Sequence, residues 1–318
     1  MELTYRDVEP GDGEAVLAAR NEVLHPALFG DTWRWAFTEN PNGRRAFGAF
    51  EGDAARAHWS WIPQRMWIAG KERTGGEVVE GFEAQSGRGL YALTAQALIE
   101  AHGGPKGSML LWRWPDAGEA KVLGGLLGFE TIRTDVWLVR EVGRGASPGD
   151  SAGLRPIERF DEQARWLWDR CAGAFGASVI RDADFLNWRF VDRPGAAFVR
   201  LGVHDAEGVL RGYVVYAPPT PRTVGRGWIV DWLCPPDEPE VGEALLGGAL
   251  AQAAADGARW LATLLVPWSP WFETFQRRGF VAEAPGRYLL ARSFIRKFDD
   301  LWLRDGWWYT LADSADLG

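Results

Sequence analysis

Short stretches of alternating hydrophobic and polar residues, separated by turn residues, fill the first half of the chain and predict a sheet with helices. Alternation on both sides of Glu51-Gly52-Asp53 is typical of a hairpin, so the leading strands should be antiparallel. Apolar residues then recur at helical spacing between Leu90 and Ala101, and His102-Gly103-Gly104 ends that helix. The predicted strands of this half are residues 3–8, 46–50, 57–62, 64–69, 109–114 and 135–140, with a further strand at the apolar run 78–82. The predicted helices begin near residues 14, 32, 90 and 115.

A glycine turn joins one of these strands to the helix at Leu90. The β-branched residues Val78 and Val79 precede Ser86-Gly87-Arg88-Gly89, and the helix follows directly. Two glycines allow positive φ angles, so that consecutive N–H groups can point at one anion, and the helix start adds its partial positive charge. The turn is therefore either a phosphate or pyrophosphate site, or a solvent-facing turn without a ligand.

The second half of the chain repeats features of the first. Residues 35–41, Trp-Ala-Phe-Thr-Glu-Asn-Pro, are echoed by residues 188–194, and Leu127-Gly128-Phe129 is echoed at nearly the same spacing by Arg278-Gly279-Phe280. Two echoes with nearly one period predict a duplicated domain. We therefore expect domains at residues 1–142 and 154–318, joined by a linker at 143–153 that is rich in Gly, Ser and Pro.

The second copy lacks the glycine turn. The strand predicted at residues 227–233 is followed by Cys-Pro-Pro-Asp-Glu-Pro-Glu at 234–240. Prolines remove N–H donors and acidic side chains repel phosphate, so we predict that this copy has lost the anion site.

Composition narrows the classes of protein and partner. With 318 residues the chain can form two domains that each bury a core, and its net charge of −8 argues against nucleic-acid binding and favours a small cationic acceptor. The sequence shows neither a transmembrane span nor a signal peptide, so we expect a cytoplasmic protein without a membrane partner. The 2 cysteines and 4 histidines lack metal-type spacing, so no metal site is expected, and most of the 19 tryptophans should pack inside the domains.

The strand, glycine turn and helix resemble a known signature. Strand, R/Q-x-x-G-x-G/A and helix form the pyrophosphate motif of the GNAT superfamily of acetyl-CoA-dependent N-acyltransferases, and residues 86–91 resemble a variant of it. Ser86 stands where Arg or Gln is usual, and Tyr91 where a small residue is usual. The resemblance implies an α/β fold of two tandem GNAT-like domains, each with a mixed, mostly antiparallel sheet and a central parallel βαβ unit flanked by helices.

The resemblance also implies where the cofactor binds. Backbone groups of Phe82, Glu83 and Ala84 would pair with the pantetheine arm of acetyl-CoA, and residues 87–90 would receive the pyrophosphate. Asp116 could either meet the cofactor or cap the following helix. The candidate cofactor residues are thus Phe82, Glu83, Ala84, Ser86, Gly87, Arg88, Gly89, Leu90, Tyr91 and Asp116.

Acyl transfer also needs a group that takes the proton of the acceptor amine. Glu80 and Glu83 are the nearest acids, and three residues apart on a strand they should face opposite sides unless a bulge intervenes. Their alternative role is that of solvated or ion-paired carboxylates. Many GNAT enzymes place a tyrosine four residues before the glycine of the Gly-Phe pair, whereas this chain has Gly124 there and Phe275 in the second copy.

Three functions follow from these features. The first is an acetyltransferase acting on a small-molecule amine, with a catalytic first domain. The second is a coenzyme A-binding or interaction module without turnover. Ser86 and the missing tyrosine favour this function. The third is a dinucleotide oxidoreductase, because Gly87, Gly89 and Ala92 also satisfy G-x-G-x-x-A. We rank it last, because antiparallel strands precede the motif and no suitably spaced acid follows. The acceptor and the oligomeric state stay open.

Overall fold

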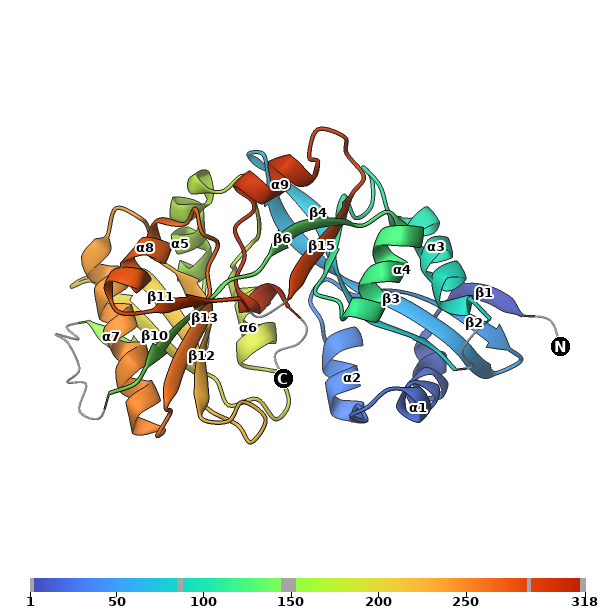
Figure 1. The fold of residues 1–318 in the computed structure, drawn as a ribbon, viewed down its shortest axis with the longest axis horizontal. Coiled ribbons are helices and arrows are strands. Elements are labelled where there is room, and N and C mark those ends of the chain that lie inside the picture. The colour runs from blue at the N-terminus through green and yellow to red at the C-terminus, as the bar shows by residue number, and fades with distance from the viewer. Residues whose placement is uncertain (1–2, 85–87, 144–152, 285–286, 315–318) are drawn as a thin grey trace. The chain divides into compact units, whose positions relative to one another are not determined.

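A computed structural model describes residues 3–84, 88–143, 153–284 and 287–314 (Figure 1). Its contacts divide the chain into two units. Unit 1 comprises Met1–Met66, Glu72–Arg133 and Tyr288–Arg304, and unit 2 comprises Trp67–Lys71, Thr134–Arg287 and Asp305–Gly318. Most of the expected linker, residues 144–152, lies outside the described residues, so its role as a linker stays a prediction.

Unit 1 is built on a mixed sheet with the strand order β1-β2-β3-β4-β5-β15-β6. The pairs β1–β2, β2–β3 and β5–β15 are antiparallel, whereas β4 and β5 are parallel and enclose α3 as a βαβ unit. The elements of the first half are β1 (Thr4–Asp7), η1 (Pro10–Asp12), α1 (Gly13–Val23), α2 (Gly30–Phe37), β2 (Arg45–Glu51), β3 (Ala54–Ile68), β4 (Lys71–Glu83), α3 (Leu90–His102), β5 (Leu110–Arg113), α4 (Ala117–Leu127), β6 (Glu130–Thr134) and β7 (Trp137–Glu141).

Unit 2 repeats this plan with the strand order β14-β7-β13-β12-β11-β10-β8. Here β12 and β13 form the parallel pair around α7, and the pairs β8–β10, β10–β11, β11–β12, β7–β13 and β7–β14 are antiparallel. The remaining elements are β8 (Leu154–Pro156), α5 (Gln163–Cys171), η2 (Ala172–Ala174), β9 (Ala177–Val179), α6 (Ala183–Phe190), β10 (Val199–His204), β11 (Leu210–Ala217), β12 (Arg226–Leu233), α7 (Pro239–Ala255), β13 (Trp260–Leu264), α8 (Pro270–Arg277), β14 (Val281–Glu283), β15 (Tyr288–Ser293), α9 (Asp300–Gly306) and η3 (Leu311–Asp313).

Each sheet includes a strand from the other half of the chain. β15 follows β14 in sequence but pairs with β5 in unit 1, where Ala291 lies opposite Trp112. β7 precedes residues 144–152 but pairs with β13 and β14 in unit 2, where Val139 lies opposite Ala262. The units are therefore discontinuous in sequence.

The core of unit 1 lies between its sheet and the helices α3 and α4, which run side by side (Figure 1). Trp59 and Trp61 of β3 are fully buried there with Leu98 of α3 and Leu123 of α4. Since residues 59 and 61 point to one face of a strand, the alternation in the sequence sets which side of the sheet receives the helices.

The strand predictions were wrong in part. β6 (Glu130–Thr134) was not predicted, and residues 57–62 and 64–69 were expected to be two strands, whereas β3 continues through Pro63, although proline seldom lies inside a strand. Trp61, paired with Arg45, is the last residue of β3 that pairs with β2. Pro63 lies beyond that pairing, so its missing N–H costs no hydrogen bond to β2.

Candidate functional site

The strand-turn-helix element predicted from the glycine motif is present as β4, the turn at Arg88 and Gly89, and α3. Gly89 caps the helix with a φ of 71°, a left-handed conformation that favours glycine. Ser86 and Gly87 lie outside the described residues. The turn therefore has the backbone geometry expected at Gly89, and Leu90 begins the helix as predicted.

A carboxylate of the chain itself binds to the start of α3. The side chain of Glu83, at the end of β4, accepts hydrogen bonds from the backbone N–H of Arg88 at 2.9 Å and from that of Tyr91 at 3.1 Å. These N–H groups belong to the turn and the first helical turn, which have no carbonyl partner within the helix. The carboxylate of Glu83 thus occupies the anion-binding N–H groups at the start of α3.

The parallel strands β4 and β5 pair over a short stretch. Gly76 lies opposite Leu111 and Glu77 opposite Trp112. Next to this pairing, the Arg113 guanidinium lies against β4, and its Nη1 donates to the carbonyl oxygens of Val78 at 3.2 Å and Val79 at 3.0 Å. An arginine side chain therefore takes the place of further strand pairing.

Arg113 belongs to a polar network under α3 and α4. Its Nε donates to Glu119 at 3.1 Å, and the Tyr91 hydroxyl donates to the other oxygen of Glu119 at 3.1 Å. The indole of Trp59 donates to the same hydroxyl at 3.1 Å. Burial, and then the charge of Glu119, raise the pKa of Tyr91, so the hydroxyl keeps its proton.

The other predicted residues have partners inside unit 1. Glu80 forms an ion pair with Arg20 of α1 at 3.3 Å. Asp116 caps α4 and accepts from the N–H of Gly118 and that of Glu119, both at 2.8 Å, which is the capping alternative stated above. Phe82 is buried, and the N–H of Ala84 donates to the carbonyl of Arg56 on β3, so this N–H is engaged.

Sequence reasoning singled out Glu83 but not Arg113 or Glu119, which the structure connects to the start of α3 through Tyr91. Arg113 is the last residue of β5, and Glu119 lies in the first turn of α4. A charged residue at the end of a short apolar strand is a signal that could have marked Arg113. Glu119 has the appearance of an ordinary acidic residue near a helix start, so the sequence alone could not single it out.

In unit 2, indole side chains lie between the end of β12 and the start of α7. Trp271 of α8 packs against Trp232 of β12 with ring centroids 5.5 Å apart, and its indole N–H donates to the carbonyl of Cys234 at 3.1 Å. A Cβ on Gly242 of α7 would come within 2.1 Å of the same indole. Glu238, just before α7, is ion-paired with Arg211 at 2.8 Å. This helix start therefore has a carboxylate and an indole beside it.

Within the described ranges, no three His, Cys, Asp or Glu side chains are grouped so that they could hold a metal ion. Cys171 and Cys234 are buried and free, and burial raises the pKa of Cys171 to about 12, so this thiol is unreactive at neutral pH. Among the same residues, no helix combines the length and apolar character needed to cross a bilayer.

Both units have a mixed sheet with a parallel βαβ unit, so the chain contains the same α/β plan twice. No family model matches the chain, and no curated protein matches it by sequence. Solved structures do match, and they confirm that the chain has the tandem GNAT fold predicted above. Since identity to these structures is below 25%, the likeness concerns the fold alone.

Three of these structures illustrate the match. A protein of unknown function from Enterococcus faecalis, described as a probable N-acyltransferase, aligns over 92% of this chain and 73% of its own, with a TM-score of 0.67 and 12% identity. A GCN5-related N-acetyltransferase from Kribbella flavida has a TM-score of 0.65, 18% identity and coverage of 92% and 72%. N-myristoyltransferase from Saccharomyces cerevisiae, with bound myristoyl-CoA, has a TM-score of 0.58, 13% identity and coverage of 92% and 79%.

Proposed function

We propose that the chain is an N-acyltransferase that moves an acetyl group from acetyl-CoA to the amine of a small acceptor. One observation carries the proposal: two N–H groups at the start of α3 converge on a single anionic side chain, Glu83. A diphosphate oxygen accepts the same hydrogen bonds as a carboxylate oxygen. The fold supports the proposal, because a solved structure with this fold is described with bound myristoyl-CoA.

The residues present fit such a cofactor at the helix start. The N–H groups of Arg88 and Tyr91 would hold the diphosphate in place of Glu83, and the backbone of β4 from Phe82 onwards would border the pantetheine arm. Bound acetyl-CoA supplies an acetyl group that is activated as a thioester. The Arg113 guanidinium lies on the carbonyls of Val78 and Val79, which precede that part of β4.

The amine proton needs a carboxylate, and two candidates lie on β4. Glu80 is held by Arg20 of α1, whereas the partners of Glu83 are backbone N–H groups of the turn and α3. A diphosphate bound to those N–H groups would release Glu83, but at the end of the cofactor that is remote from the thioester, so release does not rank Glu83 above Glu80 as the general base. Tyr91 stays protonated and bound to Glu119, which makes it a weak acid toward a leaving thiolate.

A second candidate function is a coenzyme A-binding or interaction module without turnover. It is favoured by the same contacts, because Glu83 already satisfies the helix start and Arg113 already satisfies the carbonyls of β4. Gly124, at the place of the tyrosine used by many GNAT enzymes, favours it too. The two functions differ in turnover and share the binding of coenzyme A.

Calorimetric titration with acetyl-CoA, coenzyme A and NAD, together with thiol release across a panel of amines, tests the proposal. Acetyl-CoA binding with thiol release supports the acyltransferase, coenzyme A binding without release supports the module, and binding of NAD alone would contradict both. These assays also need a variant that reports on the turn itself.

Gly89→Glu is that variant, and Gly89→Ala is its matched control. A Cβ at Gly89 would meet none of the described atoms beyond its chain neighbours within 4 Å, so both variants carry the same left-handed strain of about 1 kcal/mol and only the glutamate adds negative charge. We expect Gly89→Glu to abolish coenzyme A binding and Gly89→Ala to retain most of it. Equal affinity of the two variants would reject the turn as the diphosphate site.

A further inference from the structure

Unit 2 contains a cavity of about 460 Å³, and none of the residues predicted for the cofactor lines it. One wall is a face of the sheet, formed by Trp137 of β7 with Trp228 and Val230 of β12. Side chains alternate along a strand, so residues 228 and 230 share this face, whereas Ile229 packs in the core on the other side. The loop at 193–198, the β11–β12 hairpin and Leu311 form the other walls.

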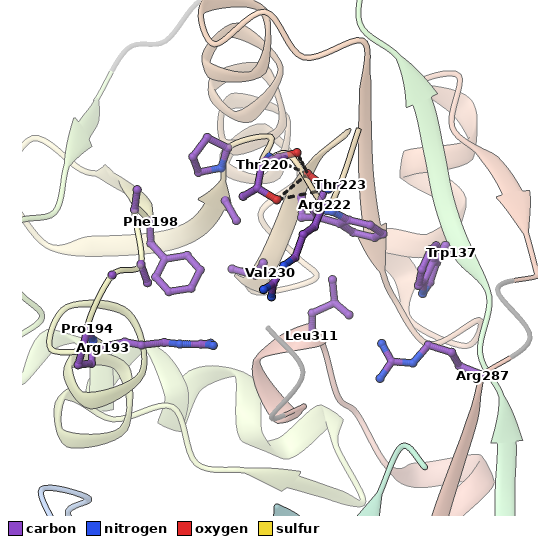
Figure 2. A pocket seen from close by; sticks show the side chains of 16 residues that line it. Trp137, Arg193, Pro194, Phe198, Thr220, Arg222, Thr223, Val230, Arg287 and Leu311 are labelled. Atoms are coloured by element: carbon purple, nitrogen blue, oxygen red, sulfur yellow. Dashed lines mark hydrogen bonds between the residues drawn. The ribbon is translucent and has the colours of Figure 1, made fainter. Parts of the chain in front are cut away.

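Aromatic and aliphatic side chains form most of the surface of this cavity. Trp137 packs edge-on against Trp228 with ring centroids 4.7 Å apart. Figure 2 shows Phe198 and Trp137 on opposite sides of the cavity, with Val230 and Leu311 between them. The three aromatic side chains are only partly buried, so apolar surface inside a concave site stays in contact with water. Covering such surface with an apolar ligand is favourable.

The polar side chains among the described lining residues offer a ligand few new hydrogen bonds. Thr220 and Thr223 bind each other: the Thr220 N–H donates to the Thr223 hydroxyl at 2.7 Å, and this hydroxyl donates to the Thr220 carbonyl at 3.2 Å. Arg193 and Arg287 both have interaction partners within the protein, and Arg222 is exposed to solvent on the hairpin. Exposed charges contribute little to binding, because water and salt screen them. The free energy of binding therefore has to come mainly from apolar contacts.

The charges around the cavity disfavour a cationic ligand. None of the described residues that line the cavity is acidic. Arg226 lies 5.6 Å from the ring centroid of Trp228 and 5.8 Å from that of Trp137, so the two indoles that could attract a cation already have one beside them. Glu283, in turn, is the ion-pair partner of Arg226 at 3.6 Å. An ammonium ligand would thus meet arginines without a carboxylate to offset them.

We propose that this cavity binds a small uncharged molecule whose apolar ring lies against Trp137, Phe198 and Trp228. Its volume falls within the range of about 300–1,000 Å³ that is typical of small-molecule sites. Aromatic side chains contact a ring edge-on or in offset stacks, and both arrangements add to the gain from burying apolar surface. The site needs no acyl transfer in unit 1, so it stands or falls separately from the function proposed above.

Calorimetric titration of the full chain with 4-phenylbutanamide, and with analogues that change one property each, tests the proposal. 4-Phenylbutyrate and 4-phenylbutylamine add a negative or a positive charge, and butanamide lacks the ring. We expect 4-phenylbutanamide to bind more tightly than all three, with an affinity that salt does not change and with a negative heat-capacity change. Absence of its binding at millimolar concentration, equal binding of butanamide, or tighter binding of either charged analogue would overturn the proposal.

Trp228→Ala tests whether 4-phenylbutanamide binds in this cavity, and we expect its affinity to fall about tenfold. Trp260→Ala is the matched control, because Trp260 is a partly buried tryptophan of the adjacent strand β13 that does not line the cavity, and it should bind as the parent does. Phe198→Ala repeats the test from a loop, without a change in the sheet, and should also weaken binding. Unchanged affinity in both lining variants, or the same loss in Trp260→Ala, would overturn the assignment.

Discussion

Replacing Glu83 should make the protein less stable and, under the proposed function, make it bind coenzyme A more tightly. The carboxylate caps α3 through two hydrogen bonds of 2.9 and 3.1 Å in a partly exposed position. Caps of this kind contribute about 1–2 kcal/mol to the free energy of unfolding. A diphosphate that uses the same N–H groups must first displace the carboxylate, so the free energy of coenzyme A binding is reduced by about the same amount.

Glu83→Gln should therefore lower the free energy of unfolding and strengthen coenzyme A binding by similar amounts of free energy. A loss of about 1–2 kcal/mol in the free energy of unfolding corresponds to a gain of about 5- to 30-fold in affinity for coenzyme A. Pantetheine, which lacks the diphosphate, should show no such gain. Glu80→Gln is the control, because Glu80 lies on the same strand but contacts Arg20 instead of α3.

Calorimetric affinities and urea unfolding of the parent and the two variants measure both quantities. If Glu83→Gln destabilises the protein while its affinity for coenzyme A is unchanged or lower, the diphosphate does not use these N–H groups, and the competition we describe is wrong. If Glu83 is also the general base, the same variant combines tighter coenzyme A binding with slower thiol release.

Two further predictions concern buried charged groups. Burial, and then Arg44, lower the pKa of His58 from 6.5 to about 3. The free energy of unfolding should therefore fall by about 1.4 kcal/mol per pH unit as the pH falls below 6.5. The Cε1–H NMR signal of His58 should not titrate between pH 7 and 5, and a titrating signal would contradict this burial. Asp313→Asn should lower the free energy of unfolding in urea by about 3–5 kcal/mol, because Asp313 and Arg181 form a fully buried ion pair at 2.6 Å. Asp192→Asn, in an exposed ion pair, should lower it by about 1 kcal/mol or less. Equal losses in the two variants would refute the importance of the buried pair.

The sequence predicted local elements well where periodicity and glycine chemistry act together. Apolar spacing from Leu90 located α3 almost to the residue, and the glycine at 89 has the left-handed conformation that the turn requires. Both signals depend on neighbouring residues, so one sequence suffices to detect them.

Contacts between distant residues could not be predicted in the same way. Nothing in the sequence around Glu83 shows that its carboxylate turns back to the N–H groups of α3 rather than toward an acceptor. The partners of Arg113 lie on β4 and α4, up to 35 residues away in the sequence. Only the tertiary fold brings such groups together.

Because β7 pairs in unit 2 and β15 pairs in unit 1, neither half of the chain contains all the strands of its own sheet. A ribosome that has released residues 1–142 has supplied β7 but not β15, so Leu111 and Trp112 of β5 still lack the neighbour that covers their edge. If the two halves were expressed separately, divided near residue 143, Leu138 and Val139 would lie in an unpaired apolar strand of one fragment, and Leu290 and Ala291 in one of the other. Exposed strands of this kind aggregate. The sheet of unit 1 is consequently complete only after β15 has been synthesised.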